Sequence, residues 1–224
     1  MPVWCFYSHS SFKPLAIKLA AVMVLHTWGQ RMNPHVHAHV IVPVGGLSLD
    51  GMRWVHPSDP DAFFETDGLA RRFREAFLDG LEEMYRNGYR KGRRRLKLRF
   101  TGRLAHLAEK EKFDAWLAPL RTKDWVVHCQ GPSEESKAPD AALKYLANYV
   151  TGTAIRDGRI VADDGERVWF TAKDYRHDGR KTTLWATGEE FVRRFLWHIL
   201  PPRCMRVRYY GFLANSCRNE DLET

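Results

Sequence analysis

Cysteine is scarce in this 224-residue sequence, and no two cysteines are spaced as in a known metal or redox motif. The four are Cys5, Cys129, Cys204 and Cys217. Without a Cys-x-x-Cys pair, the sequence has neither a zinc-ribbon pattern nor a thioredoxin-type redox motif. Scattered cysteines in a chain of this size are typical of free thiols in a reducing compartment, so we expect a cytoplasmic protein.

Long hydrophobic runs are also absent. The longest apolar run near the start, residues 19–25, is far shorter than the roughly 20 residues that cross a membrane. The first residues lack the basic-then-apolar order of a signal peptide. Hydrophobic residues still make up 44% of the sequence, enough for a sizeable core. We therefore expect a globular protein without membrane contact, built as one large domain or as a domain with an appendage.

Acidic residues are the minority charge, with 27 of them against 35 Lys and Arg, which gives a net charge of +8. This balance favours a polyanionic partner such as nucleic acid, although a mildly basic soluble protein has the same composition. The densest basic segment, residues 90–99, contains no acid. Its cations are Arg90, Lys91, Arg93, Arg94, Arg95, Lys97 and Arg99. The segment is either a contact to a DNA backbone or a solvated basic strand or hairpin.

Hydrophobic periodicity predicts a mixed set of elements. Helices are expected over residues 69–85, 104–120, 140–150 and 189–200. Strands are expected over 22–28, 35–44 and 124–130, followed by a β-meander over 159–187. The first two strands can pair as a hairpin across the polar turn at 29–34. This order indicates an α+β fold.

Three histidines alternate along the second predicted strand. His35, His37 and His39 share one face because side chains two positions apart point the same way. Imidazole is a common ligand for divalent metals, whereas the alternative is a solvated histidine face. Two imidazoles alone hold a metal poorly, so a further ligand is expected. His26 on the preceding strand is a candidate, since pairing brings it beside His37 or His39; His35 or a distant carboxylate are the alternatives.

Two tyrosines occur four residues apart in the predicted helix over 140–150. Tyr145 and Tyr149 therefore lie on one helix face. Tyrosine is a covalent nucleophile in several enzymes, and a metal that polarises a phosphate favours its attack. The alternative is a pair of half-buried structural tyrosines. A metal-binding histidine strand in the same protein favours the catalytic interpretation of the pair.

The segment TWGQRMNPHVHAHVIVPVGGL, residues 27–47, resembles the signature of the two-tyrosine HUH rolling-circle transposases of the insertion-sequence ninety-one group. The spacing from the TWGQ motif assigns the HUH pair to His37 and His39. YLANYVTGTAI, residues 145–155, resembles the tyrosine helix of this family, and residues 168–215 resemble its C-terminal region. The resemblance extends over about residues 22–216.

The resemblance implies an HUH endonuclease-like antiparallel sheet with flanking helices. It places a catalytic domain at residues 21–155 and a C-terminal β-meander and helix region at 156–224. Residues 1–20 scarcely match the strand and helix that precede the TWGQ strand in family members. No counterpart of the family's cysteine-rich zinc-binding domain is present in the sequence.

The resemblance also implies an activity. A divalent metal, Mg²⁺ or Mn²⁺, would be held by His37, His39 and a third ligand. Tyr145 or Tyr149 would attack single-stranded DNA at transposon ends, leaving a 5′-phosphotyrosine and a free 3′-OH, and the second tyrosine would permit a second cleavage. The protein would then be nucleoid-associated when bound to DNA.

Alternatives remain open at this point. All-imidazole ligation would also suit Zn²⁺ or Ni²⁺. A DNA-binding remnant of such a transposase would keep the fold without turnover, and a zinc-dependent hydrolase would need neither tyrosine.

Overall fold

The computed structural model describes residues 17–58, 66–91, 94–129, 144, 147–148 and 150–217. The described residues form two compact units, each with its own hydrophobic cluster. The first unit comprises described residues of 17–58 and 144–217, and the second comprises those of 66–129. Helices occur together with antiparallel strands, as predicted for an α+β protein.

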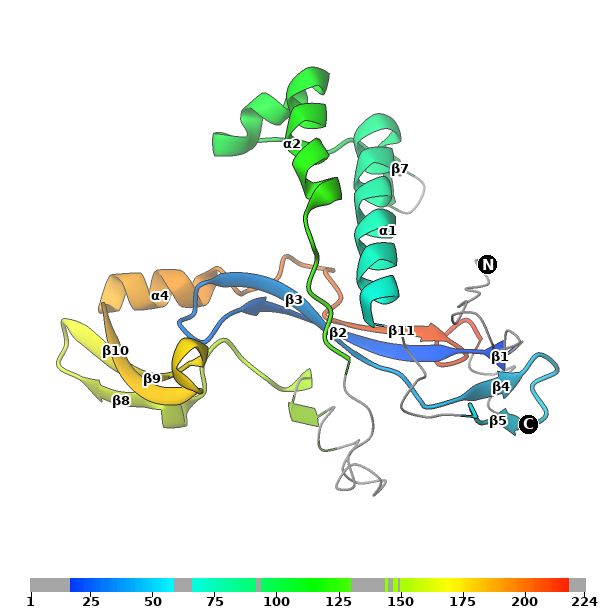
Figure 1. The fold of residues 1–224 in the computed structure, drawn as a ribbon. Helices are drawn as coiled ribbons and strands as arrows, with labels where there is room; N and C mark the ends of the chain where they lie inside the picture. Colours follow the sequence, from blue (N-terminus) through cyan, green and yellow to red (C-terminus); the bar gives the residue numbers. More distant parts are fainter. Residues whose placement is uncertain are drawn as a thin grey trace. The chain divides into compact units, whose positions relative to one another are not determined.

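The central sheet of the first unit has the strand order β11–β2–β3 (Figure 1). It contains β2 (Ala20–Trp28), β3 (Pro34–Ile41) and β11 (Val207–Gly211). Every second residue of β2 from Ala20 to His26 is buried, as expected for an apolar strand with one covered face. The predicted hairpin is confirmed, since β2 and β3 pair antiparallel. The strand β11 pairs with the other edge of β2.

Two smaller antiparallel sheets complete the strands of this unit. The first has the order β1–β4–β5, with β1 (Ile17–Lys18), β4 (Gly46–Ser48) and β5 (Trp54–Val55). The second has the order β10–β9–β8, with β8 (Ile160–Asp163), β9 (Arg167–Asp174) and β10 (Arg180–Thr187). The second sheet confirms the meander predicted over 159–187.

Helix α4 (Gly188–Leu196) follows β10 directly and lies along the meander (Figure 1). Its N-cap is Thr187, whose hydroxyl accepts a hydrogen bond from the Glu190 backbone N–H at 3.3 Å. Phe191 of α4 contacts the fully buried Phe170 of β9, with ring centroids 5.8 Å apart. Phe170 belongs to a buried cluster with Met32 from the turn between β2 and β3. One core cluster of the first unit therefore lies between the meander, α4 and this turn.

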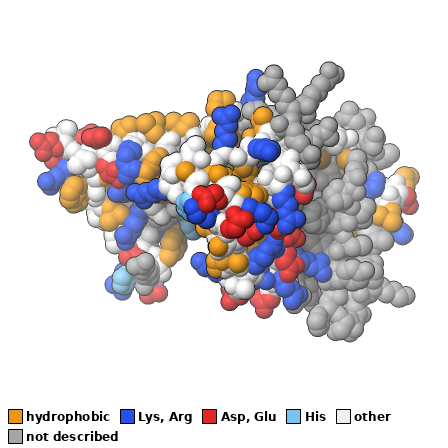
Figure 2. Space-filling view, turned by 90° about the horizontal axis from the view of Figure 1, so that it is seen from above, with side chains coloured by type: hydrophobic (Ala, Val, Ile, Leu, Met, Phe, Trp, Pro, Cys, Tyr) orange, Lys and Arg blue, Asp and Glu red, His pale blue; other side chains and the backbone are white. Residues whose placement is uncertain are grey.

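The second unit is mainly helical. It contains α1 (Thr66–Asn87), a 3-10 helix (Gly102–Ala108), α2 (Lys110–Thr122) and a hairpin of β6 (Tyr89–Lys91) and β7 (Arg94–Leu96). Its buried cluster centres on Leu78 and Phe113, and Tyr85 stacks on Phe113 with ring centroids 3.9 Å apart. Ion pairs such as that of Arg121 with Asp79 join the helices at the surface. On the face in Figure 2, cationic and anionic side chains intermingle over the described surface.

The structure changes several predicted elements. The helix predicted over 104–120 is split, because residues 102–108 form a 3-10 helix and α2 begins only at Lys110. The helix predicted over 189–200 ends at Leu196. The strand predicted over 124–130 is wrong for residues 124–129, which have no regular structure, and residue 130 lies outside the described residues. Val126 there is 95% exposed, so its β-branched side chain has no packing partner to hold a strand.

The sequence of α1 predicts an apolar stripe of residues spaced four apart, Leu69, Phe73, Phe77 and Leu81, but the buried face of the helix differs from it. Leu78 is buried, whereas Phe73 and Phe77 are about half exposed and contact Trp125. Steps of four residues advance 40° beyond a full turn, so such a series winds away from the core. Leu78 lies outside that series, and it joins the core cluster together with Leu81 and Tyr85, so the core-facing side of α1 runs through these three residues.

Candidate metal centre

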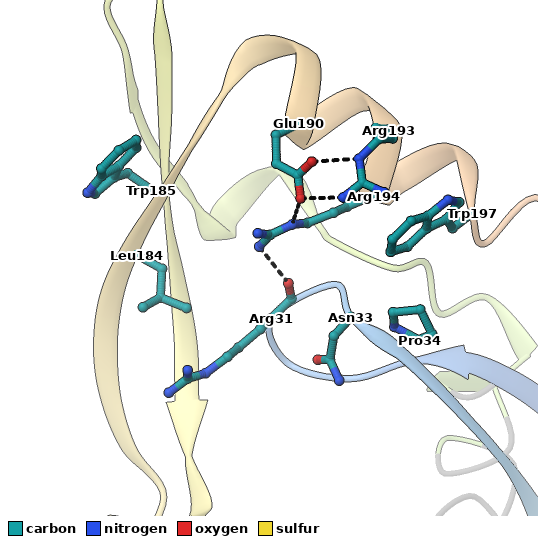
Figure 3. A pocket seen from close by; sticks show the side chains of 9 residues that line it. All are labelled: Arg31, Asn33, Pro34, Leu184, Trp185, Glu190, Arg193, Arg194 and Trp197. Carbon is teal, nitrogen blue, oxygen red and sulfur yellow. Dashed lines mark hydrogen bonds and ion pairs between the residues drawn. The ribbon is translucent and has the colours of Figure 1, made fainter. Parts of the chain in front are cut away.

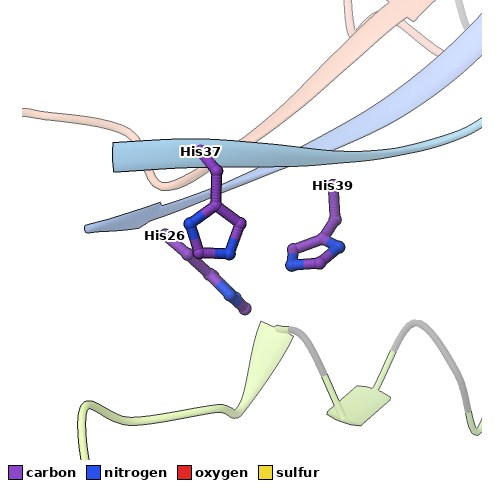
Figure 4. Close-up of side chains that lie close together, drawn as sticks. All are labelled: His26, His37 and His39. Atoms are coloured by element: carbon purple, nitrogen blue, oxygen red, sulfur yellow. The ribbon is translucent and has the colours of Figure 1, made fainter. Parts of the chain in front are cut away.

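Three imidazoles meet on one side of the β2–β3 hairpin. His26 comes from β2, and His37 and His39 come from β3; one ring nitrogen of each lies within 4.8 Å of those of the other two. Figure 4 shows the three rings pointing into a shared space. His26 is buried and the other two are partly exposed. The donor set is therefore open to solvent on one side.

Strand pairing explains this convergence. His26 is the direct cross-strand partner of His37, and Val24 is the partner of His39. Paired residues of an antiparallel sheet point to the same face, so all three imidazoles project together. The sequence-based choice of His26 beside His37 and His39 agrees with this placement.

His35 lies beside this group but outside it. The register shifts between His26 and Trp28, because the next paired residue after His37 is Pro34, opposite Trp28. The intervening residues of β3 form an irregularity that interrupts the strict alternation assumed from the sequence. The His35 ring is exposed and its centroid lies 4.8 Å from that of His37.

The backbone of His35 nevertheless acts on the site. The Nδ1 atom of His37 is 2.8 Å from the His35 carbonyl oxygen. A carbonyl can only accept, so His37 carries its proton on Nδ1 and donates it to that oxygen. The Nε2 lone pair of His37 is thereby left available for a metal, which is how backbone carbonyls orient many histidine ligands.

His39 is held in its neutral form at neutral pH. Burial, together with the neighbouring His26 and His37, lowers its pKa to about 4. Metal ligation requires the neutral imidazole, because protonation removes the lone pair. A divalent cation between the rings would therefore not compete with a proton on His39 at neutral pH.

The donor set fits a divalent metal. Metal–imidazole bonds are about 2.0–2.1 Å, so two such bonds span at most about 4.2 Å between nitrogens. The observed limit of 4.8 Å is slightly wider, and small ring rotations would close it. A set of three imidazoles suits Zn²⁺ or Ni²⁺, and by itself it does not favour Mg²⁺ or Mn²⁺.

A second layer of side chains lies behind His26. The His26 ring stacks on Trp28, with centroids 4.5 Å apart and planes inclined by 20°. The other neighbours of Trp28 are Arg206, whose guanidinium carbon is 4.9 Å from the ring centroid, and His198. Stacking on Trp28 therefore restricts the orientation of the His26 ring.

His198 joins the two ends of the β2–β3 turn. Its Nε2 donates to the Met32 carbonyl at 3.0 Å, and its Nδ1 lies 3.1 Å from the Thr27 hydroxyl. Sequence reasoning missed this buried histidine, because it lies more than 160 residues from both partners in the sequence. No local motif around His198 signals the contact.

The remaining residues of the TWGQ motif anchor the same turn. A Cβ on Gly29 would lie 2.6 Å from the Asn33 side-chain oxygen, so a larger residue there would displace the Asn33 side chain. Arg159 donates to the carbonyl of Gln30 and to that of Thr171 on β9. The Gln30 side-chain oxygen accepts from the backbone N–H of Lys173 at 3.3 Å. The motif therefore ties the histidine hairpin to the meander.

The predicted nucleophiles Tyr145 and Tyr149 lie outside the described residues. Between and beside them, residues 144, 147–148 and 150 are helical. The role of the tyrosines therefore remains a prediction from the sequence.

The predicted basic segment lies in the second unit and is only partly described. Arg90 and Lys91 are in β6, and Arg94 and Arg95 are in β7, which matches the hairpin alternative for their backbone. Arg93 lies outside the described residues, whereas Lys97 and Arg99 are exposed. Its contact with DNA stays a prediction.

Among the helices that the structure describes, none has the length and apolar character to cross a membrane.

Comparison with known proteins gives consistent matches over most of the chain. A family model described as "Y2_Tnp: Putative transposase" matches residues 20–221. "Putative transposase y4qJ" of Sinorhizobium fredii is 39% identical over 208 residues, which cover 93% of this chain and 49% of the relative. The "Transposase for insertion sequence element IS801" of Pseudomonas savastanoi pv. phaseolicola is 26% identical over 205 residues, covering 91% and 45%. The chain thus spans about half the length of these relatives. No solved structure gave a significant match.

Proposed function

Because the chain belongs to the Y2_Tnp family of transposases, we propose that it is a metal-dependent endonuclease and strand transferase of the two-tyrosine HUH rolling-circle type. Its substrate is single-stranded DNA at transposon ends. The observation that carries this proposal is the convergence of His26, His37 and His39 on one face of the β2–β3 hairpin.

The three imidazoles would hold one divalent metal, Mg²⁺ or Mn²⁺. A bound divalent ion supplies a Lewis acid that withdraws charge from a phosphoryl oxygen. His37 contributes through Nε2, because its Nδ1 proton is engaged by the His35 carbonyl. Trp28 stacked on His26 limits rotation of that ligand, so the donor set keeps its orientation between turnovers.

The covalent step falls to Tyr145 or Tyr149. The phenol loses its proton to water and its oxygen attacks the scissile phosphorus, forming the tyrosine O–P bond. The P–O3′ bond breaks, and the leaving oxygen takes up a proton to become the free 3′-OH. The number of phosphodiester bonds is conserved, so a later attack by a 3′-OH can rejoin strands without an external energy source. The second tyrosine permits a second cleavage before the first is resolved.

A covalent protein–DNA adduct is the decisive product. We would incubate the chain with labelled, random-sequence single-stranded oligonucleotides and Mn²⁺, and look for a retarded species on a denaturing gel. The Tyr145→Phe/Tyr149→Phe double variant should form no adduct, because it retains the rings and lacks the nucleophilic oxygens. The matched control is Tyr209→Phe, which removes a half-exposed phenol from β11 and should leave adduct formation unchanged.

Other outcomes would point elsewhere. An adduct that persists in the double variant would assign the nucleophile to another residue. Wild-type protein that binds both Mn²⁺ and single-stranded DNA without forming an adduct would be a DNA-binding remnant. Cleavage that survives in the double variant and depends on Zn²⁺ would indicate the zinc-dependent hydrolase.

A further inference from the structure

An open pocket of about 440 Å³ lies at the turn end of the histidine hairpin, within the first unit. It is bounded by the β2–β3 turn, by β10 and by α4 with the residue that follows it (Figure 3). Its lining combines cations with aromatic and aliphatic groups: Arg31, Asn33, Pro34, Leu184, Trp185, Glu190, Arg193, Arg194 and Trp197. The proposed reaction leaves this pocket without a role.

Two tryptophans at the pocket are unusually exposed. Trp197 is 49% exposed and Trp185 is 54% exposed, although indole side chains contribute most to stability when buried. A guanidinium covers part of each ring: Arg193 lies 4.0 Å from the Trp197 centroid, and Arg167 lies 4.6 Å from that of Trp185. Cation–π contact holds each ring in place on one face and leaves the remaining surface to a ligand.

The charge of the lining is positive. The lining contains three arginines and one carboxylate, Glu190, so the pocket has two excess positive charges. Glu190 accepts hydrogen bonds from Arg193 at 2.6 Å and from Arg194 at 2.7 Å, which fixes both guanidinium groups (Figure 3). The Arg31 side chain is 57% exposed, and its ion pair with Asp174 has a long separation of 3.9 Å. Arg31 is therefore the cation most accessible to an anionic ligand.

We propose that this pocket binds an unpaired nucleotide of the single-stranded DNA substrate, with the base against Trp197 and a phosphate at Arg31. Aromatic platforms combined with cations are the usual means of holding single strands without sequence preference, because every base has a π face and every nucleotide a phosphate. A base in a duplex is stacked on both faces and cannot use such a platform. The inference rests on the proposed function for the identity of the strand.

The position of the pocket relative to the histidines supports this assignment. Pro34 lines the pocket and begins β3, and His37 follows three residues later, roughly 10 Å along the strand. The hairpin is tied to the meander and to His198 by the hydrogen bonds described above, so pocket and histidines belong to one framework. The pocket and the histidine group therefore lie close to each other along β3.

The test measures DNA binding without cleavage, in EDTA, by fluorescence anisotropy of labelled single strands. Trp197→Ala should weaken binding about 5- to 100-fold, the effect of losing one stacked base. Trp197→Phe, which keeps an aromatic face, should recover most of the loss. Arg31→Gln should lower the slope of log K against log salt by about 0.7, the contribution of one phosphate contact.

Abasic DNA provides the sharpest control. On an abasic strand of equal length, wild type and Trp197→Ala should bind equally, since no base is left to stack. The matched protein control is Trp54→Ala, which removes a partly exposed indole on β5 of the same unit and lies outside the pocket lining. It should bind single strands like wild type.

Each remaining result is informative. The inference is overturned if wild type binds normal and abasic strands equally. It is also overturned if Trp197→Ala keeps the wild-type affinity and Arg31→Gln keeps the wild-type salt slope. Adduct formation shows independently whether the proposed function holds. Wild type that binds duplex as tightly as single strands, with both variants unaffected, also overturns it and would leave the pocket to a protein partner. Failure of wild type to bind any single strand would overturn both proposals.

Discussion

The two compact units of this protein differ in how their functional residues are assembled. In the first unit, contacts join segments far apart in the sequence: β2 pairs with β11, and His198 reaches Thr27 and Met32. In the second unit, neighbouring segments of 66–129 form the core. The three converging histidines belong to the first unit, whereas the dense run of cations belongs to the second. The candidate chemistry therefore depends on long-range pairing, and the predicted electrostatic contact depends on a local segment.

The largest effect should come from the histidines. His26→Ala, His37→Ala and His39→Ala should each reduce Mn²⁺ affinity more than 100-fold and bring cleavage to background, since loss of even an outer partner of a ligand typically costs 10- to 100-fold. Isothermal titration with Mn²⁺ measures the affinity. His35→Ala is the control and should do much less, because its contribution is a backbone carbonyl that alanine retains. Equal losses in all four variants would show that the register shift does not separate His35 from the site.

The buried clusters of the two units can be destabilised separately. Phe170→Ala and Phe113→Ala each remove a fully buried ring, so each should cost about 3–5 kcal/mol of the unfolding free energy. Phe170 shares its cluster with Met32 in the histidine hairpin turn, and Phe113 lies in the helical cluster. Phe170→Ala should therefore weaken Mn²⁺ binding, and Phe113→Ala should leave it near wild type. Chemical denaturation with and without Mn²⁺ distinguishes the two variants. Loss of Mn²⁺ binding in Phe113→Ala would mean that the two units unfold together.

The predicted basic contact should have an intermediate effect. Arg93→Gln/Arg94→Gln/Arg95→Gln should weaken binding to single strands of every sequence and lower the log–log salt slope by up to about two units, at roughly 0.7 per contacted phosphate. Titrations at several salt concentrations measure this slope. Lys112→Gln on α2, which removes a cation already paired with Glu109, is the control and should leave the slope unchanged. A slope that the triple variant does not alter would place the segment away from DNA.

The smallest effect is expected from the layer behind the histidines. Thr27→Val removes the hydroxyl that His198 contacts and should cost about 1 kcal/mol of unfolding free energy. Mn²⁺ affinity should change less than tenfold, because cross-strand pairing with His37 positions His26 directly. Thermal denaturation and the Mn²⁺ titration together give both values. A larger loss of affinity than of stability would show that His198 positions the ligands.

The proximity of the three histidines could be predicted from the sequence, whereas the pocket could not. His26, His37 and His39 follow from two adjacent strands and one turn, where period-2 alternation and hairpin pairing are local rules. The position of His35 could not be predicted, because a register shift leaves no clear mark in the sequence. Trp197 and Arg31 come together only through the tertiary fold.

The helical unit also shows that local sequence does not reveal tertiary packing. The amphipathic pattern located α1 and α2, but it misjudged which residues of α1 face the core, with Leu78 buried and Phe73 exposed. At Val126, the local β-branched pattern was misleading because a strand also needs a partner, which a short sequence window cannot reveal.

The pairing of β2 with β11 has a consequence for the newly made chain. As the ribosome releases the protein, β2 and β3 emerge early and can pair, but the other edge of β2 waits until residues 207–211 have been synthesised. During that interval an apolar strand presents unpaired backbone groups, which is the arrangement that invites intermolecular strand addition. The segment 66–129 is translated in the meantime and can form its own core from neighbouring residues. The histidine sheet therefore depends on its last strand to cover this edge, and synthesis that stops before residue 207 would leave the edge of β2 unpaired.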